Sequence, residues 1–186
     1  SGLFEHVVIS TDSNEIAENA IKYYNVTIHM RPNNLLDIQS DEANQIMSYD
    51  LDQTDGEYFI QTHSTNPMVK GETINKAVKV FFDNIDKYDS LFSVTALQKR
   101  LYDSNGKALN HDPKNLIKTQ DQPLIFEENS CFYLFSRKIF TKINNRIGNK
   151  PYFFKIDRYE AVDIDEEYDF LFAEKLMQNR LTKLSN

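Results

Sequence analysis

Short apolar runs alternate with amphipathic stretches along most of the chain. Continuous runs of β-branched and aromatic residues predict strands at residues 7–10, 26–30, 58–62, 91–95, 131–135 and 152–156. Apolar residues spaced three and four apart predict helices from about Glu15 onward and at residues 41–51, 73–88, 137–143 and 166–184. Strands that alternate with helices in this way are typical of βαβ units. The pattern therefore predicts an α/β fold on a mostly parallel sheet.

Two local features refine this outline. Asp12 with Glu15 three residues later resembles a capping box, which predicts that the first helix begins there. Its apolar stripe comprises Ile16, Ala17, Ala20, Ile21 and Tyr24. Residues 98–128 are polar and irregular, with turn-forming sequences at 103–106 and 111–113. The simplest organisation is one domain over residues 1–186 with a protruding excursion at 98–128.

Composition narrows the classes of protein to consider. The chain has 186 residues, 40% of them apolar, which is enough for one core. Its net charge of 21 − 28 = −7 argues against a nucleic-acid binder, which needs a basic face. No apolar stretch reaches the length of a membrane span, and no signal peptide opens the chain. The one cysteine, Cys131, lies in an apolar run and predicts a small core residue in a reducing compartment. We therefore expect a cytoplasmic protein that binds neither nucleic acid nor membrane.

Glycine is scarce and scattered. The five glycines are Gly2, Gly56, Gly71, Gly106 and Gly148. No two lie within five residues of each other, so neither G-x-G-x-x-G nor a P-loop is present. A phosphate cradle made of glycine backbone is thereby excluded for these 186 residues.

The strongest local motif is an acidic pair near the end of the chain. Asp163 and Asp165 would present two carboxylates on the same side of an extended segment, with Ile164 turned into the core. Two hard oxygen ligands suit Mg²⁺ or Mn²⁺ when phosphates supply more of the octahedron. The alternative is an acidic helix N-terminus, in which these residues favour the dipole of the following helix. A three-residue motif alone does not separate the two interpretations.

A run of hydrogen-bonding side chains follows the predicted strand at 58–62. His63, Thr65 and Asn66 lie there, and ligands of open α/β sheets bind outside the carboxyl ends of the strands. These side chains could form hydrogen bonds to a base or a sugar, or they could belong to an ordinary capped loop.

Arg31 likewise follows a predicted strand, the one at 26–30. It could hold a phosphate or carboxylate bidentately, or be a solvated arginine beside a turn proline.

Taken in chain order, six segments resemble the CMP-sialic acid synthetases, also called acylneuraminate cytidylyltransferases. Residues 2–17, 31–35, 63–68, 89–94, 128–133 and 161–174 are similar to the family's GLFDEVVVSTDSEEIA, RPxxL, QPTSPL, DSxxSV, xNGxxY and AxDIDxxxDxxxAE sequences. Each match is short, but six in the right order over nearly the whole chain are specific. The resemblance implies a Rossmann-like, three-layer α/β/α nucleotide-diphospho-sugar transferase fold. It also implies transfer of CMP from CTP to the anomeric hydroxyl of a nine-carbon 2-keto sugar acid, a nonulosonic acid, with release of pyrophosphate.

The resemblance also implies roles for particular residues. Asp163 and Asp165 match the family's catalytic, metal-binding acids, which hold Mg²⁺ or Mn²⁺. The implied nucleotide-binding residues are Arg31, His63, Thr65 and Asn66. The implied sugar-acid contacts are Lys118, Asn129, Tyr133, Phe153 and Phe154, although paired aromatic residues are more often part of a core. Members of the family are homodimers, and an excursion such as 98–128 reaches across to the partner.

The chain departs from the family at several positions. His63, Asn66 and Ser130 stand where the family has glutamine, serine and glycine, which leaves the sugar acid open among sialic, legionaminic, pseudaminic and other nonulosonic acids. Nothing matches the family's opening RxGSKxxxxKN loop, so we expect a chain that lacks its phosphate loop and binds triphosphate poorly. Two alternatives remain. One is a non-catalytic homologue that acts as a binding or dimer-partner subunit, and the other is a metal-dependent glycosyltransferase that uses Asp163 and Asp165.

Overall fold

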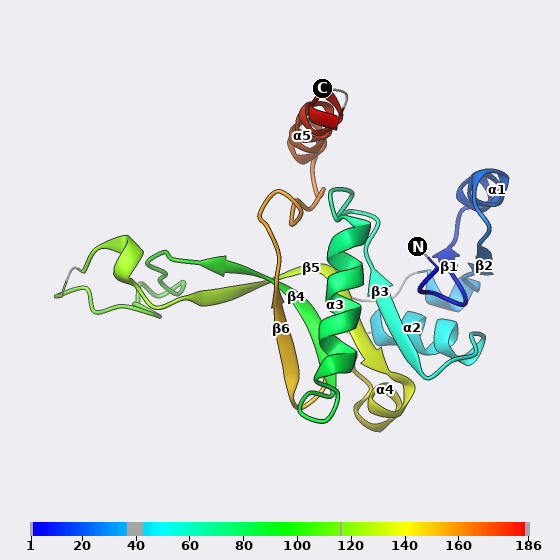
Figure 1. The fold of residues 1–186 in the computed structure, drawn as a ribbon, viewed down its shortest axis with the longest axis horizontal. Helices are drawn as coiled ribbons and strands as arrows, with labels where there is room; N and C mark the ends of the chain where they lie inside the picture. The colour runs from blue at the N-terminus through cyan, green and yellow to red at the C-terminus, as the bar shows by residue number, and fades with distance from the viewer. Residues whose placement is uncertain (1, 37–42, 116, 185–186) are drawn as a thin grey trace. The chain divides into compact units, whose positions relative to one another are not determined.

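Strands and helices alternate through the computed structural model, which describes residues 2–36, 43–115 and 117–184 (Figure 1). The elements in chain order are β1 (Val8–Thr11), α1 (Asn14–Tyr23), β2 (Thr27–Met30), α2 (Ala43–Asp52), β3 (Tyr58–Thr62), α3 (Gly71–Asp83), β4 (Ser90–Leu97), β5 (Ile125–Ser136), α4 (Arg137–Ile143), β6 (Pro151–Lys155) and α5 (Glu167–Leu184). Short 3₁₀ helices occur at Asn33–Leu35 and Thr119–Asp121. The alternation confirms the predicted α/β class.

The chain divides into two compact units. Unit 1 comprises Ser1–Phe59 and Phe135–Gly148, and unit 2 comprises Ile60–Leu134 and Asn149–Asn186. The single domain predicted from the sequence stays a prediction.

Unit 1 contains a parallel pair of strands. β1 and β2 run parallel, with Val8 opposite Thr27 and Thr11 opposite Met30. Helix α1 connects them and contacts both, as expected of a βαβ unit. Its N-cap is Ser13, one residue after the predicted Asp12, because the Ser13 hydroxyl accepts a hydrogen bond from the Ile16 amide at 3.3 Å.

The predicted apolar stripe of α1 is buried only at its small residues. Ala17 and Ala20 are buried, whereas Ile16, Ile21 and Tyr24 are 53%, 61% and 68% exposed. The alanines alone allow the helix backbone to approach the two short strands closely, and the larger side chains flank that narrow contact.

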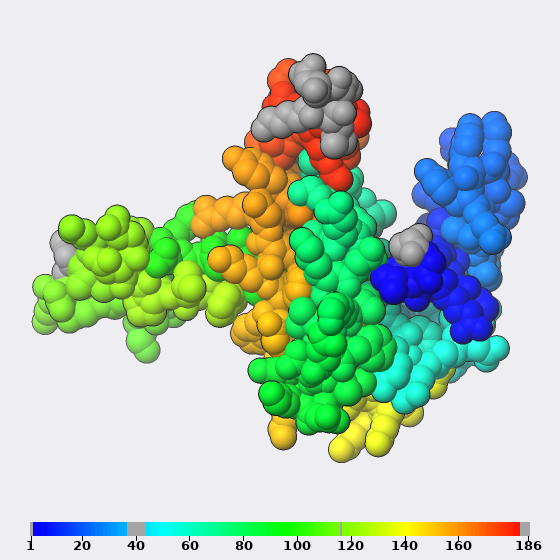
Figure 2. All heavy atoms as spheres, in the orientation of Figure 1, coloured from blue at the N-terminus to red at the C-terminus, as the bar shows by residue number. Residues whose placement is uncertain are grey.

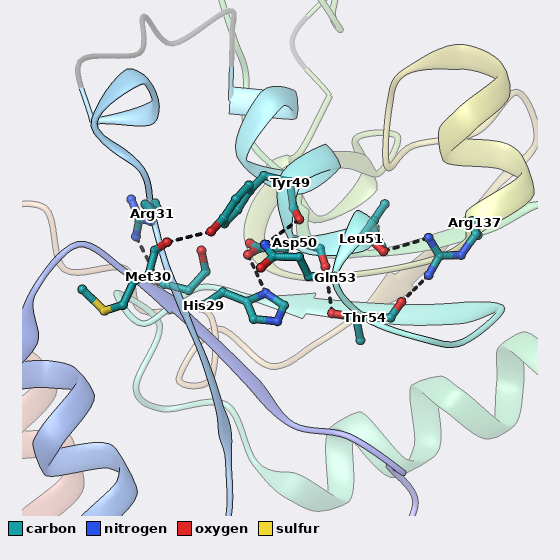
Figure 3. A network of polar contacts seen from close by, with 10 residues as sticks. His29, Met30, Arg31, Tyr49, Asp50, Leu51, Gln53, Thr54 and Arg137 are labelled. Carbon is teal, nitrogen blue, oxygen red and sulfur yellow. Dashed lines mark hydrogen bonds and ion pairs between the residues drawn. The ribbon is translucent and has the colours of Figure 1, made fainter.

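A polar network ties β2, α2 and α4 together inside unit 1 (Figure 3). The Nδ1 atom of the buried His29 lies 2.9 Å from Oδ1 of Asp50 on α2. The guanidinium of Arg137, the first residue of α4, donates to the carbonyl oxygens of Leu51 and Gly56 at 2.8 and 3.0 Å, and also to that of Thr54. The Leu51 carbonyl lies in the last turn of α2 and also accepts from the Thr54 amide, and Thr54 and Gly56 follow the helix, so Arg137 fastens the end of α2 and the loop after it.

A four-stranded sheet has the order β3-β5-β4-β6. β4 and β6 are parallel, with Ser90 opposite Pro151 and Val94 opposite Lys155. In unit 2, α3 packs on this sheet through a buried apolar cluster that contains Ala77, Phe81, Leu91, Cys131, Phe132, Leu134 and Ile156. Helix α5 packs through Ala173 against Met68 and Val162.

The last residues of the predicted excursion belong to a strand. β4 continues to Leu97 and β5 already begins at Ile125, so the irregular stretch covers residues 98–124. It contains an antiparallel bridge between Tyr102 and Ala108. Figure 1 shows this segment leading away from the sheet of its own unit, and in Figure 2 its atoms are uncovered on the side seen. Across the described parts of the chain, no helix is both long enough and apolar enough to cross a membrane.

Candidate functional site

Two segments of unit 2 lie side by side, joined by hydrogen bonds. The Ile164 amide donates to the Thr65 carbonyl at 2.9 Å. The side-chain amide of Asn66 donates to the Val162 carbonyl at 3.3 Å. The polar run after β3 therefore lies beside the acidic pair, although about a hundred residues separate them in the sequence.

Asn66 holds the two segments together. It is only 5% exposed, and its amide nitrogen donates to the Val162 carbonyl. Its Oδ1 atom is buried without a partner, and its predicted contact with a nucleotide stays a prediction. Thr65 and His63 remain in the loop as candidates for contact with a nucleotide.

The acidic pair flanks a residue of an apolar cluster. Val162 and Ile164 pack in the cluster with Met68, and the chain bends at Asp165, so the shared orientation of Asp163 and Asp165 stays a prediction. The Oδ1 atom of Asp163 is buried without a hydrogen-bond partner, and Asp165 is exposed. A carboxylate oxygen that has lost water and gained no donor is stabilised by a cation.

The donor set suits a hard divalent cation that shares its coordination with a substrate. No group of three or more His, Cys, Asp or Glu side chains in the described ranges is arranged to hold a metal by itself. Asp163 and Asp165 together supply two hard oxygen ligands, so a Mg²⁺ or Mn²⁺ ion held there would need further oxygens, such as those of phosphates.

The first turn of α5 is capped by a different acid. The Oδ2 atom of Asp169 accepts hydrogen bonds from the amides of Asp165 and Glu166 at 3.2 and 3.0 Å. The two amides just before the helix are thus satisfied from inside its first turn. Asp169, and not Asp163 or Asp165, supplies this hydrogen-bond acceptor, and a favourable effect of the acidic pair on the helix dipole stays an alternative.

Glu160 fixes the approach to the acidic pair, and the sequence did not reveal it. It is 6% exposed, its Oε2 accepts from the Lys70 amide at 3.0 Å, and its Oε1 lies 3.1 Å from the Lys70 ammonium. Burial alone would raise the pKa of Glu160. Hydrogen bonds from Thr73 and Lys70, with the Lys70 charge, outweigh burial and hold the pKa below its ordinary value. This contact anchors the turn before Asp163 to the start of α3.

Cys131 is an inert core residue, as predicted. It is fully buried, and desolvation, followed by the negative charges of Asp163 and Glu160, raises its pKa to about 12. The thiol therefore stays protonated at neutral pH and is not a nucleophile.

A row of aromatic rings extends across unit 2 from the polar loop. His63 and Tyr133 have ring centroids 6.1 Å apart, Tyr133 and Phe92 6.2 Å, Phe92 and Phe153 4.9 Å, and Phe153 and Phe126 5.7 Å. Phe153 is 48% exposed, so this end of the row offers a ring face to a ligand.

Phe154 is separated from Phe153 by the sheet. Its ring packs against Phe132, with centroids 5.9 Å apart, and belongs to the apolar cluster under α3. Successive residues of a strand point to opposite faces, so the two phenylalanines of β6 cannot line one pocket. The structure places Phe154 in the apolar cluster and Phe153 on the other face, so the predicted sugar-acid contact is kept as a candidate for Phe153.

Asn129 and Tyr133 lie in a polar corner at the bend of β5. With its amide oriented to satisfy its neighbours, Asn129 donates to the Ser93 hydroxyl at 2.6 Å and accepts from that of Thr95 at 3.0 Å. The Tyr133 hydroxyl contacts the Glu128 carboxylate and lies 3.2 Å from the Ser130 hydroxyl oxygen. The structure thus joins Tyr133 to His63 through their rings and to residues 128–130 through its hydroxyl.

Lys118 belongs to the excursion of unit 2, and Arg31 belongs to unit 1. Lys118 is exposed on the excursion, and within the described residues no hydrogen bond or ion pair joins it to the acidic pair or the polar corner. Arg31 belongs to unit 1, where its guanidinium donates to the Ser10 carbonyl at 3.0 Å. Its Nε is buried without a partner, which is compatible with an unfilled contact to an anion.

Comparison with known protein sequences agrees with the arrangement in unit 2. The profile of a family described as Cytidylyltransferase matches residues 1–185. The chain is 29% identical over 193 residues to the post-translational flagellin modification protein B of Campylobacter coli, which covers 97% of this chain and 80% of that protein. It is 25% identical over 186 residues to the pseudaminic acid cytidylyltransferase of Campylobacter jejuni, covering 95% and 79% of the two chains. It is 27% identical over 193 residues to the CMP-N,N′-diacetyllegionaminic acid synthase of the same species, covering 95% and 79%.

Solved structures establish the fold. The 4-diphosphocytidyl-2C-methyl-D-erythritol synthase of Anaerococcus prevotii matches with a TM-score of 0.64 at 12% identity, over 94% of this chain and 82% of that one. A CMP:2-keto-3-deoxy-manno-octonic acid synthetase complexed with CTP matches with a TM-score of 0.50 at 15% identity, over 97% and 68%. These likenesses confirm a Rossmann-like nucleotidyltransferase fold.

Proposed function

The chain belongs to the cytidylyltransferase family, and on that premise we propose that it transfers CMP from CTP to the anomeric hydroxyl of a nonulosonic acid. The observation that carries the proposal is the meeting of three features in unit 2. They are the polar loop at His63 and Thr65, the acidic pair, and the row of rings that includes Phe153. The names of the relatives support pseudaminic and legionaminic acids as acceptors to test first.

In this reaction the anomeric oxygen forms a bond to the α-phosphorus, and the bond from that phosphorus to the bridging oxygen breaks. Pyrophosphate leaves with those electrons, and the hydroxyl proton passes to solvent. A Mg²⁺ or Mn²⁺ ion, when bound, supplies charge neutralisation at the phosphates. Asp163 and Asp165 would hold that ion. Glu160 anchors the backbone before this pair and Asp169 caps the backbone after it, which would limit how far the two acids must reorganise during the step.

Different residues would bind the nucleotide and the sugar acid. Thr65 and His63 would contact the nucleotide from the loop, while Asn66 keeps that loop against Val162. The exposed ring of Phe153 would pack on an apolar face of the sugar acid, which lowers its freedom before attack.

We also infer a homodimer through the excursion. Its exposed apolar side chains include Tyr102, Leu109 and Leu124, which are 53%, 60% and 52% exposed. Sedimentation of wild-type protein and of a Leu109→Glu variant tests this, since the charge should shift the protein to monomer. A wild-type monomer at micromolar concentration would contradict it.

The complete gene product is assayed for pyrophosphate release from CTP with Mg²⁺ and a panel of nonulosonic acids, with product mass as a second readout. We expect release with at least one acid, a CMP-sugar mass, and little turnover with UTP or GTP. A protein that releases no pyrophosphate with any acid would support the non-catalytic homologue. Release of a nucleotide from a donor sugar, without consumption of CTP, would support the glycosyltransferase.

A further inference from the structure

Ser130 has a backbone conformation that serine rarely adopts. Its φ is +57°, in the left-handed region that favours glycine, and it is one of two non-glycine residues with positive φ among the described residues. The other, Asn144, is the C-cap of α4 and follows a common pattern for helix ends. Ser130 ends no helix, so its strain has no such explanation. A residue kept in a strained conformation where glycine would be comfortable suggests that its side chain has a function.

The Ser130 hydroxyl belongs to a short hydrogen-bonded chain. The Tyr133 hydroxyl contacts both the Glu128 carboxylate and the Ser130 hydroxyl oxygen, the latter at 3.2 Å. A phenol has a single proton and a carboxylate only accepts, so the Tyr133 proton is directed to Glu128. The hydroxyl groups of Ser130 and Tyr133 share the second hydrogen bond. The chain runs from Ser130 through Tyr133 to Glu128, and the Ser130 oxygen is left with acceptor capacity.

This acceptor lies next to the candidate site. Tyr133 is fully buried and its ring lies 6.1 Å from that of His63, whereas Ser130 is half-buried and still reachable. Asn129, the preceding residue, is held against Thr95 of β4, so the bend cannot easily move away. The strained backbone, the fixed neighbours and the buried Tyr133 together hold the Ser130 oxygen in one place.

We propose that Ser130 is a specificity-determining residue whose hydroxyl oxygen accepts a hydrogen bond from an N–H or O–H substituent of the sugar acid. This inference rests on the proposed function and adds which chemical feature of the sugar acid the protein recognises. An acid that presents a donor to Ser130 is selected, because an acid without that donor leaves the half-buried oxygen unpaired.

The test uses two substitutions that separate the hydroxyl from the strain. Ser130→Ala removes the hydroxyl but keeps the Cβ and the strained φ, whereas Ser130→Gly removes both. Ser104→Ala, in an exposed turn of the excursion, is the matched control. Each protein is assayed for pyrophosphate release from CTP with the acid that the wild type prefers. The same assay is run with analogues of that acid in which one N–H or O–H donor at a time is deleted.

We expect both Ser130 variants to raise KM for the preferred acid about 3- to 10-fold, which is the effect of one lost hydrogen bond, with KM for CTP unchanged. One deletion analogue should be insensitive to Ser130→Ala, and Ser130→Gly should also raise Tm. Unchanged KM for the acid in Ser130→Ala, or an equal rise with every analogue, would overturn this inference while the proposed function stands. Absence of wild-type turnover with every acid would overturn both, and the wild-type control makes the two failures distinguishable.

Discussion

At the scale of single residues, burial distinguishes side chains that build the site from those that can touch a ligand. The loop after β3 supplies a run of polar residues at 63–66, and only the structure shows that Asn66 among them is buried. A sequence records that a side chain can form hydrogen bonds, but not which partner it has. The side-chain amide of Asn66 donates to the carbonyl of Val162, which is far away in the sequence, and no local sequence pattern predicts that contact.

Asn66→Ala should lower the free energy of unfolding by about 1–3 kcal/mol, because the Val162 carbonyl loses its donor in a buried place. Denaturant unfolding measures this loss, with Asn105→Ala in an exposed turn as the control. If Asn66 instead read the nucleotide, the variant would keep wild-type stability and raise only KM for CTP.

Cys131 gives a pH-dependent prediction. Its pKa is raised to about 12 in the folded protein, against an ordinary value of 9.0, so the native thiol stays protonated well above neutral pH. The raised pKa stabilises the fold fully below pH 9, and that contribution is lost as pH rises toward 12. Iodoacetamide at pH 8 should therefore leave the native protein unmodified by intact mass and should alkylate it once denatured. Rapid alkylation of the native protein would contradict the burial of this thiol.

At the scale of elements, boundaries could be predicted where an apolar run meets turn-forming residues, as at β3 and α4, whose bounds agree with the sequence pattern. Helix α3 was predicted to run to residue 88 but ends at Asp83. The Asn84 side chain donates to the Val80 carbonyl at 2.9 Å, which satisfies an acceptor of the last turn. Phe82, in the last turn of α3, is 45% exposed. Periodicity does not report such competing side-chain contacts.

The start of α5 depends on one carboxylate. Asp169→Ala should lower the free energy of unfolding by about 1–2 kcal/mol, since two amides lose a charged acceptor. Hydrogen exchange at the amides of Asp165 and Glu166 should become faster than in the wild type. Glu174→Ala, an exposed acid further along the same helix, is the control. Equal effects of the two substitutions would show that Asp169 is not a cap.

At the scale of the whole molecule, the sequence predicted the fold class and the family because both depend on order along the chain. The strand-helix alternation and the six family-like segments can be recognised without knowing which residues contact each other in the fold. Glu160 and the Ser130 corner could not be predicted, because each depends on a tertiary partner or on a backbone angle. The sequence therefore predicts the fold class and the family, whereas the arrangement of the site depends on contacts that form only in the folded protein.

The central claim is that the acidic pair serves CMP transfer. Pyrophosphate release from CTP and the preferred nonulosonic acid is measured for wild type and Asp165→Asn, with Asp86→Asn as an exposed control. We predict that Asp165→Asn loses at least about 100-fold in kcat/KM while its far-UV circular dichroism and Tm match the wild type, because a preorganised charge is lost and no buried contact is. Asp86→Asn should be fully active. Wild-type turnover by a folded Asp165→Asn protein would contradict the account.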